Sequence, residues 1–151
     1  MVRTRPEVGT VSEVRAVTDV LPGPWGGDRI EIHGIQASGK HGLLPHERFH
    51  AQPFVVDLIC WLDLAPAGAS DELSDSVDYS ALAQLVRDRI VGEPVNLVER
   101  LAHEIAEECL QQPLITSVQV SVHKPHAPVG LLVDDIVVTV RRDRLTEKEA
   151  K

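Results

Sequence analysis

The sequence contains four side chains that can move protons or hold a polar ligand: Glu47, Tyr79, Glu99 and Lys124. Lys124 follows an apolar run and precedes a rigid Pro-x-x-Pro turn, and residues 28–142 contain one other lysine, Lys40. An amine that is withdrawn from water can act as a general acid and base, because desolvation lowers its pKa toward neutrality. The residues alone nevertheless favour a simpler interpretation, in which a lysine at the end of a strand is solvated.

The other three side chains also have simple structural interpretations. Glu99 follows Asn96 by three residues, which is the spacing of a capping box, so its carboxylate can cap the helix that begins there. Tyr79, the single tyrosine of the chain, can pack at the start of a helix. Glu47 follows Pro45 in a predicted loop, where a carboxylate is ordinarily solvated. On the residues alone these alternatives stay open.

The elements that must position these side chains follow from the periodicity of the apolar residues. In chain order, the predicted elements are strands over 29–39 and 52–64, helices over 81–90 and 96–109, and strands over 117–122 and 136–142. Paired strands on either side of a helix pair predict an α+β fold of order ββααββ, with a four-stranded antiparallel sheet and both helices on one face. A loop containing Pro45 joins the first two strands, and residues 68–76 form a polar loop.

Composition limits the class of protein. The 151 residues are 43% hydrophobic and 25% charged, which is ordinary for one globular domain. With 15 basic and 23 acidic residues the net charge is −8, which argues against nucleic acid or an anionic membrane as a partner. Cys60 and Cys109 lie in apolar runs and are expected to be buried free thiols. No run approaches the ~20 apolar residues of a membrane span, and the N-terminus lacks a secretory signal, so we expect a cytoplasmic protein.

The chain divides into three segments. Residues 1–27 form a flexible N-terminal extension that ends in Leu-Pro-Gly-Pro-Trp-Gly-Gly, a run that continues neither a helix nor a strand. A short amphipathic helix over 11–20 is one option within it. Residues 28–142 form the single domain, and residues 143–151 form a charged C-terminal tail. The open face and the unpaired edges of the predicted sheet favour assembly with copies of the chain.

Four motifs, in order and at compatible spacing, make residues 28–142 similar to the dihydroneopterin aldolase family of folate biosynthesis. The motifs are His41-Gly42 followed by Glu47, Asp78-Tyr79, the run Asn96-Leu97-Val98-Glu99-Arg100-Leu101-Ala102, and the run His123-Lys124-Pro125-His126-Ala127-Pro128. The resemblance implies the tunnelling fold, in which ββααββ subunits join edge to edge into a ring. It also implies a homo-oligomer, either a ring of four or an octamer of two stacked rings, with pterin sites between neighbouring subunits.

The resemblance implies catalytic roles for three residues. Lys124 is the general acid and base of the reaction. Tyr79 reaches into the site of the neighbouring subunit, stacks near the pterin and handles a proton in the second half-reaction. Glu47 makes a polar contact to the reacting side chain of the substrate and to its water.

The resemblance also implies a substrate, 7,8-dihydroneopterin, and the residues that bind it. Glu99 accepts the amino group and the ring N–H of the pterin together, assisted by backbone groups near Val98 and, from the next subunit, Val77. Cleavage yields 6-hydroxymethyl-7,8-dihydropterin and glycolaldehyde, and the C=N bond of the ring takes up the electrons of the broken C–C bond. The resemblance therefore implies no metal, no Schiff base and no other cofactor, and it implies an epimerase side activity.

The sequence departs from the family pattern at three places. Residues 1–27 have no counterpart in the family core, and we assign them no role. Val133 stands where an aromatic residue is expected before Asp134, which affects local packing. The segment 43–46 is unusual and bears on the loop that carries Glu47.

Three other functions are alternatives. A dihydroneopterin triphosphate 2′-epimerase would need a basic cluster for the triphosphate, and the sequence offers the scattered Arg48 and Arg100. A metal enzyme of the same fold would use His41, His46 and His50 as ligands, although no His-x-His pair lies on a predicted strand. A ring-forming scaffold that merely binds pterins would need the binding carboxylate but not the catalytic lysine.

Overall fold

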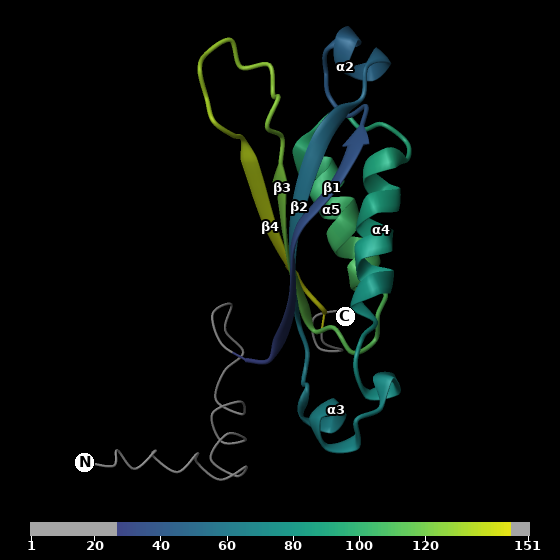
Figure 1. Ribbon diagram of the computed structural model, residues 1–151. Coiled ribbons are helices and arrows are strands. Elements are labelled where there is room, and N and C mark those ends of the chain that lie inside the picture. The colour runs from purple at the N-terminus through teal and green to yellow at the C-terminus, as the bar shows by residue number, and fades with distance from the viewer. Residues whose placement is uncertain (1–26, 146–151) are drawn as a thin grey trace, which may run out of the picture.

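The computed structural model describes residues 27–145, and Figure 1 shows how the elements are arranged. In chain order the elements are β1 (Arg29–Gly39), α2 (Pro45–Phe49), β2 (Gln52–Trp61), α3 (Ala65–Ser70), a 3-10 turn (Leu73–Asp75), α4 (Tyr79–Val91), α5 (Val98–Cys109), β3 (Ser117–His123) and β4 (Val137–Asp143). The optional helix over 11–20 lies outside the described residues, and so do residues 146–151 of the predicted tail.

The four strands form one antiparallel sheet in the order β1-β2-β3-β4. Helices α4 and α5 pack on one face of the sheet and leave the other face open (Figure 1). The core lies between the helices and the sheet, and alternate strand positions such as Val56, Leu58 and Val120 supply the sheet's share of it. The predicted α+β fold of order ββααββ is confirmed.

Two short helices occupy segments that the sequence assigns to loops. Helix α2 forms in the Pro45 loop, because proline suits the first helical turn and the Glu47 carboxylate accepts the Leu44 amide at 3.3 Å. Residues 65–70 form α3 and residues 73–75 form the 3-10 turn, where a polar loop over 68–76 is expected. The spacing of apolar residues does not predict α2, α3 or the 3-10 turn, because none of them buries an apolar stripe.

The ends of three strands also differ from the prediction, and β3 continues one residue further than expected, to His123. Strand β2 ends at Trp61, three residues early, because the amides of Leu62 and Leu64 bond to the backbone oxygen and the carboxylate of Asp28 instead of a sheet neighbour. Strand β4 spans Val137–Asp143, one residue later at each end than predicted. The sheet therefore includes the first residue of the segment assigned to the tail.

Cys60 and Cys109 are buried free thiols, as predicted. Contact with the Cys60 thiol, together with burial, raises the pKa of Cys109 and keeps its thiol protonated. Among residues 27–145, no helix is both long enough and apolar enough to cross a membrane.

Candidate active site

Glu47 and Lys124, far apart in the sequence, form an ion pair at one end of the sheet. The Lys124 Nζ atom lies 2.6 Å from Glu47 Oε2. Both residues are buried, with exposed fractions of 8% for Lys124 and 3% for Glu47. The simpler interpretations, a solvated strand-end lysine and a solvated loop carboxylate, are therefore wrong. An enclosed amine and carboxylate in contact can exchange protons with a bound ligand.

Three donors hold the Glu47 carboxylate. Besides Lys124, the side-chain amide of Gln52 donates to Oε2 at 2.9 Å and the Leu44 amide donates to Oε1 at 3.3 Å. Burial alone would raise the pKa of Glu47, but these donors outweigh it and hold that pKa below its ordinary value. Glu47 is therefore an anion that balances the charge of Lys124.

Gly42 makes room for this carboxylate. A Cβ atom at Gly42 would lie 2.3 to 2.5 Å from the carboxyl atoms of Glu47, and its φ of 152° also favours glycine. The Gly42 amide donates to the Val95 carbonyl at 3.0 Å, and the Gly42 carbonyl accepts from Arg48 Nε at 2.9 Å. The glycine thus joins the carboxylate to the loop between α4 and α5.

His41 is a structural link between three segments. Its buried ring donates from Nε2 to the Ile90 carbonyl at 2.7 Å and accepts the Val95 amide at Nδ1 at 3.1 Å. Burial lowers the pKa of His41, although the Ile90 bond opposes it, so the ring is neutral. Because both nitrogens are engaged, His41 cannot join His46 and His50 as a metal ligand. Within residues 27–145, no three His, Cys, Asp or Glu side chains are grouped to hold a metal ion.

The first turn of α5 lies at the same end of the subunit. Arg48, next to Glu47 in α2, donates both to the Gly42 carbonyl and to the side-chain oxygen of Asn96. These bonds tie the segment that carries Glu47 to the residue that precedes α5 by two positions. The half-buried Val98 and the exposed Glu99 open this helix.

The capping-box interpretation of Glu99 is wrong. Leu97 is the N-cap residue of α5, and it forms no side-chain cap bond. The side chain of Asn96 binds Arg48 instead of the helix. The side chain of Glu99 forms no hydrogen bond or ion pair with another residue of 27–145, so its carboxylate remains available to a ligand.

An open depression of about 520 Å³ lies beside this turn, and both Arg48 and Arg100 line it. The expectation that these two arginines are scattered is therefore wrong. Their guanidinium groups are already engaged, because Arg48 binds Gly42 and Asn96, and Arg100 pairs with Glu104 at 2.9 Å.

Tyr79 lies at the opposite end of the subunit. It is the first residue of α4, which begins beside α3 and runs toward the end that carries α2 (Figure 1). The carboxylate of Asp78 caps this helix and accepts the amides of Ser80 at 2.9 Å and Ala81 at 3.4 Å. The Tyr79 ring does not pack at the helix start as the simple interpretation expects, because 65% of the residue is exposed.

The length of α4 separates Tyr79 from the buried ion pair. The helix has 13 residues and is therefore about 20 Å long. Its last turn carries Ile90, which binds His41 at the end where Glu47 lies. Val77, just before the helix, is buried at the same end as Tyr79. One subunit therefore brings Glu47 and Lys124 together but keeps Tyr79 and Val77 apart from them.

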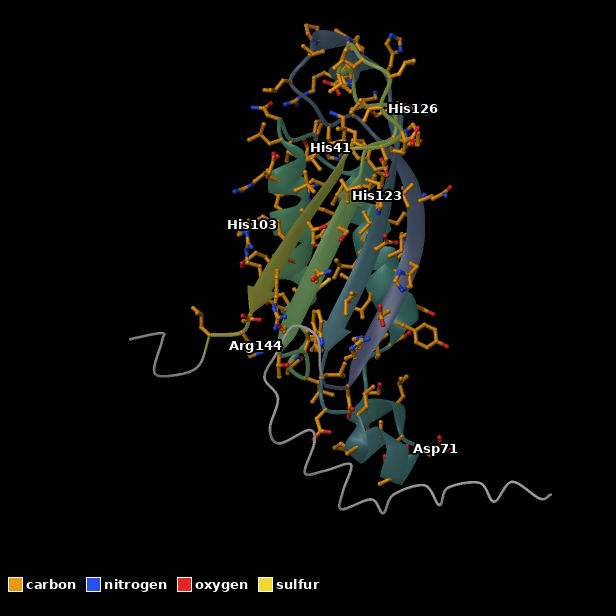
Figure 2. The ribbon with its side chains drawn as sticks, turned by 90° about the vertical axis from the view of Figure 1, so that its left-hand side faces the viewer. His41, Asp71, His103, His123, His126 and Arg144 are labelled. Atoms are coloured by element: carbon orange, nitrogen blue, oxygen red, sulfur yellow. The ribbon has the colours of Figure 1, made fainter. Side chains whose placement is uncertain are left out.

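Gln52 belongs to the site through its bond to Glu47, although it is not among the residues expected there. The signal was its position, since even-numbered residues of β2 face the core and Gln52 is the one polar member of that series. Figure 2 shows the sheet from its open face, where His123 is labelled, a residue of the fourth motif to which the sequence assigns no role. Its partners lie on two other segments, so no local pattern reveals them.

Comparisons with known proteins agree with this architecture. The family model described as dihydroneopterin aldolase matches residues 30–141, which is more than half of the chain. A dihydroneopterin aldolase from Streptomyces coelicolor is 45% identical over 118 residues, which cover 78% of this chain and 99% of the relative. One from Methylorubrum extorquens is 39% identical over 118 residues, which cover 78% of this chain and 91% of the relative.

Solved structures show the same similarity. A structure described as a dihydroneopterin aldolase from Vibrio cholerae matches with a TM-score of 0.73 at 28% identity, covering 79% of this chain and 99% of that one. The E. coli dihydroneopterin aldolase in complex with neopterin matches with a TM-score of 0.70 at 28% identity, covering 76% of this chain and 98% of that one. The sequence matches, the shared fold and the motifs lead to one conclusion: this chain belongs to the dihydroneopterin aldolase family.

Proposed function

We propose that this chain cleaves 7,8-dihydroneopterin with Lys124 as general acid and base, in a site that two subunits of a homo-oligomer share. Membership of the family makes the chain an aldolase of folate biosynthesis, which is a carbon–carbon lyase, so the scaffold alternative is set aside. The observation that carries the assignment is the buried contact of Lys124 and Glu47. The free thiols of Cys60 and Cys109 suit the reducing cytoplasm, where we expect the enzyme to work.

The substrate serves as its own electron sink. A base removes the proton of the 2′-hydroxyl, the C1′–C2′ bond breaks, and its electron pair moves through C6 onto N5 of the ring. The C2′–C3′ fragment leaves as glycolaldehyde. A proton then adds to C1′ as the electron pair returns to restore the C6=N5 bond, which yields 6-hydroxymethyl-7,8-dihydropterin. Rejoining of the fragments on the other face of the aldehyde gives the 2′-epimer, which accounts for an epimerase side activity.

The proton transfers are divided among three side chains. Lys124 in its unprotonated form accepts the proton from the 2′-hydroxyl, and Glu47 holds the hydroxylated side chain and its water beside that amine. The contact of 2.6 Å between the two residues supports this division. Tyr79 of the neighbouring subunit handles the proton for C1′, since an exposed phenol at a subunit surface can reach a site next door.

Recognition of the pterin is assigned to Glu99. Its free carboxylate can accept the amino group and the ring N–H of a pterin side by side. Backbone groups near Val98, in the same helical turn, assist it. Val77 completes this binding from the neighbouring subunit, because it lies at the same end as Tyr79.

A site whose residues come from two subunits requires an oligomer. The two edges of the described sheet, β1 and β4, offer backbone groups to strands of other subunits. Edge-to-edge pairing would close a ring of four, and two rings would stack into an octamer. The proposed site requires that the end of one subunit that carries Tyr79 meet the end of the next that carries Lys124.

A mixing experiment tests the shared site. Lys124→Met and Tyr79→Phe subunits are each prepared, shown to be deficient in formation of 6-hydroxymethyl-7,8-dihydropterin, then unfolded, mixed in equal amounts and refolded. We expect recovery in about one quarter of the sites, because each of the two residues is intact in half of the subunits. Each variant refolded alone is the control. Failure to recover activity, with native-like oligomers by light scattering, would contradict a site built from two subunits.

The dihydroneopterin triphosphate 2′-epimerase alternative would use the same machinery. The depression lined by Arg48 and Arg100 is the nearest basic feature, although both guanidinium groups are engaged. Incubation with the unphosphorylated substrate separates the two functions. We expect glycolaldehyde release from it, whereas epimerisation of the triphosphate alone would favour the alternative.

A further inference from the structure

A histidine held between two carboxylates, His123, immediately precedes Lys124 in the sequence. His123 is the last residue of β3, and successive strand side chains point to opposite faces, so His123 lies on the open face of the sheet (Figure 2). Its Nδ1 atom lies 2.7 Å from Asp135 Oδ2, and its Nε2 atom lies 2.8 Å from Asp57 Oδ2. Since ionised carboxylates only accept hydrogen bonds, both ring nitrogens donate and His123 is an imidazolium.

The two carboxylates belong to different parts of the subunit. Asp57 is part of the sheet, and its Oδ1 atom accepts the amide of Gly34 at 2.8 Å, where β1 has a bulge. Asp135 lies in the connection 124–136 between β3 and β4. This connection begins at Lys124, whose amide donates to the carbonyl of its last residue at 2.8 Å. The bond between His123 and Asp135 therefore fastens the connection to the sheet next to the catalytic lysine.

Asp135 depends on this one donor. Its Oδ1 atom is buried and has no hydrogen-bond partner among residues 27–145. His123 supplies the hydrogen bond that its carboxylate side chain receives in the described part of the chain. The Asp135 side chain is 34% exposed, so without this donor its carboxylate can exchange its place against the sheet for solvent. The connection would then lift Asp135 into water.

We propose that His123 is a positioning residue for aldol cleavage, which acts by fastening the connection 124–136 through Asp135 and thereby holding Lys124 against Glu47. The inference rests on the proposed role of Lys124. Because Lys124 acts on the breaking bond while Glu99 holds the pterin, loss of the fastening should lower kcat and leave KM nearly unchanged.

The charged surroundings of His123 give its contribution a pH dependence. Asp135 faces it from the connection and Asp57 faces it from β2, while His33 of β1 lies 3.7 Å from Asp57 and 3.3 Å from Glu31. Hydrogen bonding to Asp135 raises the pKa of His123, burial opposes this rise, and Asp57 adds to it. The bond between protonated His123 and Asp135 is therefore fully formed below the ordinary histidine pKa. It weakens as the pH rises through the elevated pKa of His123.

Two amide substitutions separate the two contacts. The side-chain nitrogen of asparagine takes the position of Nδ1, so His123→Asn keeps a donor for Asp135. The nitrogen of glutamine takes the position of Nε2, so His123→Gln keeps a donor for Asp57 alone. We expect His123→Gln to lower kcat by on the order of tenfold to a hundredfold, the cost of displacing a catalytic group by about 1 Å. We expect His123→Asn to retain kcat, as should the control His33→Asn, an exposed contact of the same Asp57.

The pH profile of kcat adds a readout that mere structural support would not move. An amide does not titrate, so His123→Asn should lose the part of the alkaline decline that belongs to His123. Wild-type kcat in both His123 variants, equal losses in both that follow the unfolding midpoint, or a loss in His123→Asn alone would each overturn the inference. Lys124→Met keeps the two proposals distinct, because retained cleavage in that variant would overturn the proposed role of Lys124 instead.

Discussion

The two ends of the subunit prepare for catalysis in opposite ways. At the end formed by α2 and the last residues of β3, Glu47 and Lys124 are buried and paired with each other. At the end where α4 begins, Tyr79 is 65% exposed. Groups that tune one another's charge must be enclosed together, whereas a group proposed to serve a neighbour must remain exposed in its own subunit.

The two ends also differ in how they are held. His41 and Arg48 tie three segments together around Glu47 through bonds to backbone carbonyls and to Asn96. The position of Tyr79, by contrast, depends on the local cap that Asp78 provides. Changes at the first end should therefore affect both chemistry and stability, and changes at the second end should separate them.

Replacement of Lys124 by methionine should have the largest effect. It removes the proposed acid and base, so kcat should fall by about 10²–10⁴-fold. It also leaves the buried Glu47 carboxylate with two donors, so the unfolding temperature should fall. Assay of glycolaldehyde and thermal unfolding measure the two effects. Lys40→Met, at the exposed second lysine of the described chain, is the matched control; wild-type kcat in the Lys124 variant would remove the contrast between the ends.

Replacement of Glu99 by glutamine should weaken binding without weakening the fold. Loss of a hydrogen bond to a charged group costs about 1.5–3 kcal/mol, so KM should rise by roughly tenfold to a hundredfold. The unfolding temperature should not change, because the side chain is exposed and unpaired within residues 27–145. Glu107→Gln, on an exposed position of the same helix, should leave both quantities unchanged. An unaltered KM in the Glu99 variant would show that another residue binds the pterin.

Acid should destabilise the first end through Glu47. Because its donors hold the pKa of Glu47 below the unfolded value of 4.5, its contribution is complete above that pH and is lost as the pH falls through the lower folded pKa. One such proton accounts for at most about 1.4 kcal/mol of unfolding free energy per pH unit. Glu47→Gln should therefore be less stable near neutrality and should show a shallower decline in acid. Urea unfolding at a series of pH values checks this, and parallel curves for the two proteins would contradict it.

Replacement of Tyr79 by phenylalanine should have the smallest effect on the fold. The exposed hydroxyl stabilises nothing in its own subunit, so the free energy of unfolding should stay within about 0.5 kcal/mol of the wild type. Proton delivery in the last step should nevertheless fail, which leaves a trapped or oxidised intermediate while the pterin still binds. Asp78→Ala, which removes the cap, should cost about 1 kcal/mol and provides the contrast. Normal turnover in the Tyr79 variant would exclude this residue from the mechanism.

The regular part of the fold could be predicted from the sequence. Alternating apolar residues locate all four strands, and the stripe that contains Leu82, Val86 and Ile90 locates α4, because burial of one face imposes a period on any long element. The period of apolar residues does not predict helices α2 and α3. They are short, and local contacts such as the bond from the Leu44 amide to Glu47 form α2 without a buried stripe.

The candidate site could be predicted only in part. The motifs place Glu47, Tyr79, Glu99 and Lys124 within a known family, and their chemical types suffice for proton transfer and for binding of a heterocycle. Their simpler interpretations were rejected only by the structure, which buries Lys124 and leaves Asn96 bound to Arg48 rather than to the helix. Burial and pairing depend on the surroundings of a side chain, and residues distant in sequence supply those surroundings.

The sequence by itself determined the order of the elements, the faces they bury and the chemistry that the side chains can perform, because these depend on residue type and period. Only the tertiary structure decided which groups act together. It joined Glu47 to Lys124, held His123 between carboxylates from two other segments, and set Tyr79 the length of a helix away. The physical reason is that contacts between distant segments depend on how whole elements pack, which no local pattern records.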